Sequence, residues 1–141
     1  MIKRVAHIAI ATKSIAVTAE FYKQIGLELD CTETLEDQNV KVAIFRAGDT
    51  GIELVEPTAE DSPISRFLEE RGEGLHHISL EVDDLEKTLQ FLKESNIQLI
   101  DEKPRRGAED RLIAFIHPSS TGGVLVELSQ PASSGEGDEV G

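Results

Sequence analysis

Cysteine is almost absent from this sequence. Cys31 is the only one, so no disulfide can form within the chain. A chain without disulfides agrees with the reducing cytosol. Long apolar runs are also lacking, because no stretch approaches the roughly 20 residues that a transmembrane helix needs. The opening residues MIKRVAHIAI lack the apolar core and small-residue cleavage site of a signal peptide. These features together lead us to expect a cytoplasmic protein.

Positive charge is scarce as well. The chain has 14 Lys and Arg residues against 27 Asp and Glu, a formal net charge of −13. Nucleic acids and acidic membranes favour basic partners, so we expect neither to bind. The exception is the segment DEKPRRGAEDR, which gathers Lys103, Arg105 and Arg106. This segment is either a solvated basic loop or a binding site for an anionic small molecule.

What the sequence does contain is an internal repeat. With 39% hydrophobic residues, 141 residues fit one globular domain. In the repeat, His7-Ile8-Ala9-Ile10 falls on His77-Ile78-Ser79-Leu80, and Phe45 falls on Phe115. The copies close with GIELVEP and GVLVELSQP, which places Glu53 against Glu127 after an insertion in the preceding turn.

Each copy predicts a βαβββ unit. An alternating strand comes first, followed by a helix (residues 14–25 and 84–95) and three short strands. Ser14 and Asp84 suit helix N-caps, and Gly26 and Asn96 suit helix ends. We therefore predict an α+β fold over residues 1–132, with two βαβββ modules forming a curved mixed sheet around a metal-binding cleft. The predicted boundaries are 1–57 for module one, 58–73 for a linker helix and 74–132 for module two, with a disordered tail at 133–141.

Strand alternation predicts where four side chains point. Successive side chains in a strand face opposite ways, so the apolar neighbours of His7, Glu53, His77 and Glu127 pack inward and leave these four on the other face. Two modules facing each other would bring the four together. Two imidazoles and two carboxylates suit a divalent metal, with Co²⁺ the first choice and Ni²⁺, Mn²⁺ or Zn²⁺ as alternatives. We expect His76 to face the other way and His117 to lie in a turn.

Several segments resemble the vicinal oxygen chelate superfamily and, within it, the methylmalonyl-CoA epimerases. The resemblance covers residues 3–130 and is carried by AHIAIA, EFYKQIGLEL, GLHHISLEVDD and FIHPSSTGGVLVEL. It implies an isomerase that interconverts (2R)- and (2S)-methylmalonyl-CoA through an enolate. It also implies metal ligands at His7, Glu53, His77 and Glu127, with Glu127 as the candidate catalytic base. Lys103, Arg105 and Arg106 would then meet the CoA phosphates, and the protein would be a homodimer.

Two positions depart from that resemblance. Some members have Gln where Glu53 stands, and some epimerases carry a second carboxylate where this chain has Val42. Val42 cannot move a proton, so the second acid/base group is left open. The alternatives are a metal-dependent glyoxalase I, a related epimerase or dioxygenase, and a non-enzymatic member of the superfamily that binds small ligands.

Overall fold

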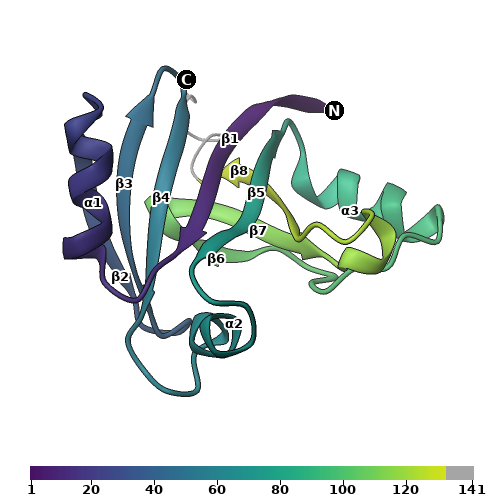
Figure 1. Cartoon of the computed structure of the whole chain (residues 1–141). Helices are drawn as coiled ribbons and strands as arrows, with labels where there is room; N and C mark the ends of the chain where they lie inside the picture. The colour runs from purple at the N-terminus through teal and green to yellow at the C-terminus, as the bar shows by residue number, and fades with distance from the viewer. Residues whose placement is uncertain (133–141) are drawn as a thin grey trace. The chain divides into compact units, whose positions relative to one another are not determined.

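The computed structural model describes residues 1–132 and has an α+β fold of two βαβββ modules (Figure 1). The first module comprises β1 (Ile2–Ala11), α1 (Ile15–Gln24), β2 (Leu29–Leu35), β3 (Val40–Ala47) and β4 (Thr50–Pro57). The second follows α2 (Pro63–Arg71) and comprises β5 (Gly74–Val82), α3 (Leu85–Glu94), β6 (Arg105–Gly107), β7 (Arg111–Ile116) and β8 (Val126–Pro131). Two 3-10 helices, η1 (Ala108–Asp110) and η2 (Pro118–Ser120), flank β7. The tail predicted at 133–141 lies outside the described residues.

The predicted helices and their caps are confirmed. The Ser14 side chain accepts a hydrogen bond from the Val17 amide at 3.2 Å, and Asp84 accepts one from the Lys87 amide at 3.1 Å. Asn96, just beyond α3, has a φ of 63°, a left-handed conformation that an asparagine tolerates and that stops a helix. Within residues 1–132 no helix combines the length and hydropathy needed to span a membrane.

Strand pairing is the same in both modules. β4 lies parallel to β1 and antiparallel to β3, and β8 lies parallel to β5 and antiparallel to β7. The outer strands β2 and β6 pair antiparallel with β3 and β7. Glu53 pairs with Ala9 on one side and Ile44 on the other, just as Glu127 pairs with Ser79 and Phe115. Cross-strand partners lie on the same face of a sheet. Ala9 and Ile44 therefore flank Glu53, and Ser79 and Phe115 flank Glu127.

This register corrects one part of the predicted repeat. Phe45 was placed over Phe115, but the structural equivalent of Phe115 is Ile44, because these two residues pair with the two glutamates. Phe45 lies on the opposite face, fully buried in the cluster that packs against α1. A shift of one residue moves a side chain to the other face of a strand. The chain from β5 to β7 is one residue longer than the chain from β1 to β3, and the two phenylalanines concealed this difference.

The chain divides into two compact units, which do not coincide with the repeat. The first unit is His7–His76, and the second combines Met1–Ala6 with the residues from His77 onward. β1 and β5 therefore each contribute residues to both units. The expectation of a single domain stays a prediction.

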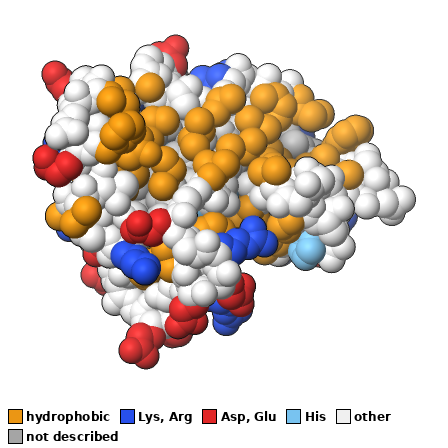
Figure 2. Space-filling view, in the orientation of Figure 1, with side chains coloured by type: hydrophobic (Ala, Val, Ile, Leu, Met, Phe, Trp, Pro, Cys, Tyr) orange, Lys and Arg blue, Asp and Glu red, His pale blue; other side chains and the backbone are white. Residues whose placement is uncertain are grey.

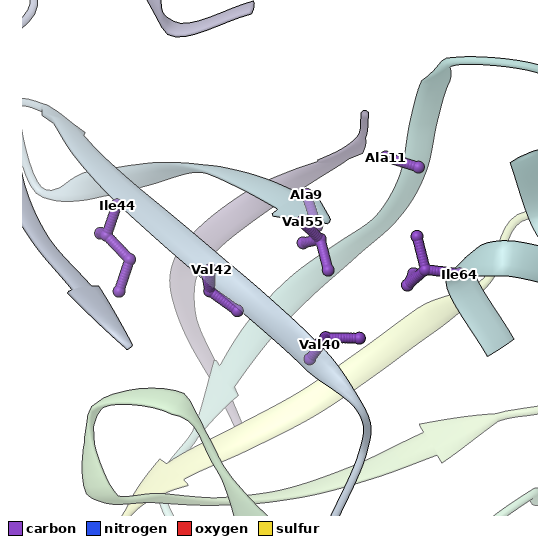
Figure 3. Close-up of a cluster of buried hydrophobic side chains, with 7 residues drawn as sticks. All are labelled: Ala9, Ala11, Val40, Val42, Ile44, Val55 and Ile64. Atoms are coloured by element: carbon purple, nitrogen blue, oxygen red, sulfur yellow. The ribbon is translucent and has the colours of Figure 1, made fainter. Parts of the chain in front are cut away.

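The two units differ in how their strands are covered. In the first unit an apolar cluster lies under α1, and a second lies on the other face of the strands, where Ile64 of α2 joins Ala9, Ala11, Val40, Val42, Ile44 and Val55 (Figure 3). Up to residue 132, the second unit has one such cluster, which packs against α3. In the second unit, the strand face opposite α3 is available for polar side chains.

Candidate metal centre

The first unit holds a buried pair of nitrogen and oxygen donors. His7 on β1 and Glu53 on β4 lie on adjacent parallel strands, and His7 Nδ1 is 3.1 Å from Glu53 Oε2. Their side chains are only 10% and 6% exposed. The unit thus presents one imidazole and one carboxylate together.

The second unit repeats this arrangement with a different neighbour. His77 on β5 and Glu127 on β8 approach to 3.6 Å between Nε2 and Oε1, and their side chains are 9% and 5% exposed. The ring of Phe115 meets the His77 ring edge-on, with centroids 5.2 Å apart. The Arg105 guanidinium lies 5.6 Å from the centre of the Phe115 ring and is held by Asp101, whose carboxylate accepts from Arg105 Nε at 3.2 Å. Phe115 thereby restricts the orientation of the His77 ring.

Burial changes the acidity of Glu127. Loss of solvent raises the pKa of this carboxyl to about 7, against the hydrogen bond from Ser79 and the positive charges of Arg111 and Arg105, which lower it. A carboxyl group with a pKa near neutrality can both accept and release a proton under physiological conditions. Glu127 therefore has the acidity of a general acid/base.

The donor set fits a divalent ion. Imidazole nitrogen and carboxylate oxygen are the ligands that borderline divalent metals take in proteins. Each unit brings one imidazole and one carboxylate close together in a buried position. A nearby cation stabilises a carboxylate most strongly where water is excluded. His7, Glu53, His77 and Glu127 all occupy the strand face that alternation predicted.

The three basic residues predicted to bind CoA have different neighbours. Arg105 pairs with Ile113 across β6 and β7 and faces Phe115. Arg106 is the next residue, so it faces the other way, and it forms an ion pair with Asp110. Lys103 lines a cavity of about 790 Å³ beside α3, together with Leu85, Leu89 and other residues.

The two remaining histidines have structural roles. The His76 ring packs edge-on against Phe67 of α2 at 4.9 Å, and burial, assisted by the charge of Arg71, lowers its pKa to about 4. It is therefore neutral at pH 7. His117 Nδ1 accepts a hydrogen bond from the Ser119 amide at 3.0 Å and caps η2. Both predictions for these residues are confirmed.

One polar group beside Glu127 was missed from the sequence. Arg111 Nη2 donates to Glu81 Oε1 at 2.8 Å and to Ser129 Oγ at 3.3 Å. Burial raises the pKa of Glu81, but the hydrogen bond from Arg111 and the charges of Arg111, Arg4 and Lys3 outweigh it, so the net pKa lies below the usual value. A signal was present in the sequence, since His77, Ser79 and Glu81 are polar at every second position of β5.

Comparison with known proteins gives a consistent family. The profile described as Glyoxalase/Bleomycin resistance protein/Dioxygenase superfamily matches residues 6–115. The mitochondrial methylmalonyl-CoA epimerase of Homo sapiens is 38% identical over 129 residues, which cover 90% of this chain and 73% of that protein. The ethylmalonyl-CoA/methylmalonyl-CoA epimerase of Cereibacter sphaeroides is 36% identical over 133 residues, with 92% and 99% covered.

A solved structure agrees in fold as well as in sequence. A methylmalonyl-CoA epimerase in complex with methylmalonyl-CoA and ammonium superposes with a TM-score of 0.90 at 34% identity, covering 94% of this chain and 97% of that one. The paired modules, the two buried His–Glu pairs and these relatives all point the same way. The chain belongs to the Glyoxalase/Bleomycin resistance protein/Dioxygenase superfamily and, within it, to the methylmalonyl-CoA epimerase family.

Proposed function

We propose that this chain is a methylmalonyl-CoA epimerase, an isomerase that interconverts the 2R and 2S forms of its substrate through an enolate. The observation that carries this proposal is the buried His–Glu pair that each module repeats, in a chain whose relatives bear that name. The carbon between the thioester and the carboxylate must lose its proton and regain it on the opposite face. The site must therefore stabilise an enolate and move a proton.

His7, Glu53, His77 and Glu127 are proposed to bind one divalent ion, Co²⁺ in the first place, with Ni²⁺, Mn²⁺ or Zn²⁺ as alternatives. The repeat supports a shared site, because each copy supplies one imidazole and one carboxylate at matching positions. When bound, such an ion supplies Lewis-acid stabilisation of the enolate oxygen. Two carboxylates offset its charge in full, so the positive charges of Arg105 and Arg111 that act on Glu127 gain importance.

Glu127 is the proposed catalytic base. Its raised pKa of about 7 matches a group that takes a proton from carbon and returns it near neutral pH. Its carboxylate is held against His77, which limits the positions it can sample. Val42 stands where some epimerases carry a second carboxylate. It is apolar and buried among Ala9, Ile44 and Val55, so no proton transfer is assigned to it.

We propose that Lys103, Arg105 and Arg106 bind different parts of the substrate. Arg105 lies over Phe115, the neighbour of His77, so it serves the acyl end of the substrate. Lys103, beside α3, and Arg106, paired with Asp110, are left for the CoA phosphates. The three residues would then contact different parts of one acyl-CoA.

A homodimer in the cytoplasm is also proposed. One side of α1 and its C-cap exposes Val17, Phe21 and Ile25, which are 73%, 57% and 60% exposed and recur at every fourth position. Hydrophobic side chains are visible over this helix in Figure 2. A row of this kind favours a protein contact. Sedimentation velocity would test the dimer, and a monomer at micromolar concentration would contradict it.

The deciding experiment for the reaction is proton exchange at C2 of methylmalonyl-CoA in D2O, followed by NMR with and without a chelator. We expect exchange at C2 with the purified protein, its loss after chelation and its return on adding Co²⁺. Absence of metal-dependent exchange would refute the proposed function. The hemithioacetal of methylglyoxal and glutathione is the matched control substrate, and turnover of that compound alone would make the protein a glyoxalase.

A further inference from the structure

A chain of buried hydrogen bonds runs away from Glu127 within the second unit. Ser79 is the cross-strand neighbour of Glu127, its side chain lowers the pKa of that carboxyl, and its hydroxyl donates to Ser129 Oγ at 3.2 Å. Ser129 Oγ accepts from Arg111 Nη2 at 3.3 Å, and the same nitrogen donates to Glu81 Oε1 at 2.8 Å. Both serines are 0% exposed. We call Ser79, Ser129, Arg111 and Glu81 the polar ladder.

The internal repeat provides a comparison for the polar ladder. The strand register makes Ala9 the equivalent of Ser79, Val55 that of Ser129, Ala11 that of Glu81 and Val40 that of Arg111. All four equivalents are apolar and buried, and they complete the cluster drawn in Figure 3. The same fold thus forms without polar groups at these positions. Burying them costs free energy unless every partner is in place, so their presence in one module calls for a reason outside folding.

The donors and acceptors fix where the Ser79 hydroxyl lies. Arginine can only donate, so Ser129 Oγ accepts from Arg111. Ser129 Oγ also accepts from the Ser79 hydroxyl at 3.2 Å, which anchors Ser79 beside its cross-strand neighbour Glu127. Arg111 is itself fixed by Glu81.

We propose that the polar ladder fixes the orientation of the Glu127 carboxylate, so that Ser79 and Ser129 are positioning residues for the proton transfer. This inference rests on the proposed function and adds to it the groups that hold the base in place. Anchored by Ser129, the Ser79 hydroxyl limits how far the neighbouring Glu127 carboxylate can turn. Misplacing a catalytic group by about 1 Å can cost a hundredfold in rate, so the contribution is kinetic.

The kinetic test compares Ser79→Ala and Ser129→Ala with Thr88→Val. Thr88 carries a buried hydroxyl on α3, bonded to the Asp84 carbonyl oxygen, so its variant loses a buried hydrogen bond elsewhere in the same unit. We expect Ser79→Ala to lower kcat by about tenfold to a hundredfold. KM and metal content should change less than about twofold in the same variant, because binding contacts are untouched. Ser129→Ala, one bond further from Glu127, should lower kcat less, and Thr88→Val should leave it unchanged.

A second readout does not depend on activity. Crystal structures of the parent and of Ser79→Ala, both without substrate, should show one orientation of the Glu127 carboxylate in the parent and several in the variant. A single unchanged orientation in Ser79→Ala would overturn the proposal, and so would an unchanged kcat in both serine variants. A parent protein that fails to epimerise methylmalonyl-CoA would refute the proposed function instead, while the crystal comparison would still decide on the polar ladder.

Discussion

The two modules share strand pairing around their glutamates, but the strand faces beside those glutamates differ. In the first module the neighbours of Glu53 are apolar, with Val42 3% exposed and Ile44 fully buried (Figure 3). In the second module the neighbours of Glu127 are the serines and the ion pair of the polar ladder. The repeat therefore separates what the fold requires from what the chemistry requires. The shared part is one histidine and one glutamate, and the unshared part surrounds the residue proposed to move the proton.

The largest expected effect tests whether the two glutamates differ in role. Glu127→Gln keeps an oxygen ligand but removes the proposed base, so kcat should fall by about a thousandfold or more. Glu53→Gln keeps an oxygen ligand at a position with no assigned proton transfer, and its kcat should stay within about tenfold of the parent. Steady-state epimerisation rates, together with the metal content of each variant, measure the difference. Equal losses in the two variants would show that the modules are functionally alike.

The next effect concerns the stability of the Glu81–Arg111 ion pair. The Glu81→Ala variant leaves Arg111, only 14% exposed at its side chain, without its carboxylate, and should lower the free energy of unfolding by about 3 kcal/mol. The double variant Glu81→Ala/Arg111→Val copies Ala11 and Val40 of the first module and should recover much of that loss. Urea unfolding measures both. A double variant less stable than Glu81→Ala would mean that the second module cannot accept the apolar face of the first.

Acid should weaken the second unit through the same glutamate. The folded pKa of Glu81 lies below its ordinary value of 4.5, so its contribution to stability is complete above that pH. The contribution is lost as the pH falls through the lower folded value. The advantage of the parent over Glu81→Gln in urea unfolding should therefore shrink below pH 4.5. An advantage that is independent of pH would contradict the assignment, and hydrogen exchange should place the early loss in β5 and β8.

The smallest effect compares the helix caps. Ser14→Ala and Asp84→Ala each remove one side-chain cap, and each should cost about 1 kcal/mol. Asp84 also places a negative charge at the N-terminus of α3, so its loss should cost slightly more at low salt. Thermal unfolding at low and high salt separates the two contributions. A greater cost for Ser14→Ala at low salt would contradict this order.

Much of the fold could be predicted from the sequence, because alternation, caps and the repeat are local signals. They placed α1 and α3 within a residue or two and predicted which strand face carries His7, Glu53, His77 and Glu127. The register of β7 could not be predicted, because a difference of one residue in the preceding connection is invisible when a phenylalanine occurs at both candidate positions.

The polar ladder was hidden for another reason. Alternation along β5 puts Ser79 and Glu81 on the face of His77, yet nothing local indicates that Ser129 and Arg111, from two other strands, complete hydrogen bonds with them. Such contacts depend on pairing across β5, β8 and β7, which alternation alone does not specify. The different neighbours of Lys103, Arg105 and Arg106 could not be predicted either, because closeness in sequence does not specify which partner each side chain meets.

The division of β1 has a consequence for how the chain is made. Met1–Ala6 belongs to the second unit, where Arg4 pairs with Glu81 at 3.0 Å and the Met1 carbonyl accepts from the Asp83 amide at 3.3 Å. During translation Met1–Ala6 is synthesised well before its partners in β5 and just beyond it. His7–His76 can therefore form its own core while the chain is being made, whereas the second unit incorporates Met1–Ala6 only after β5 has followed.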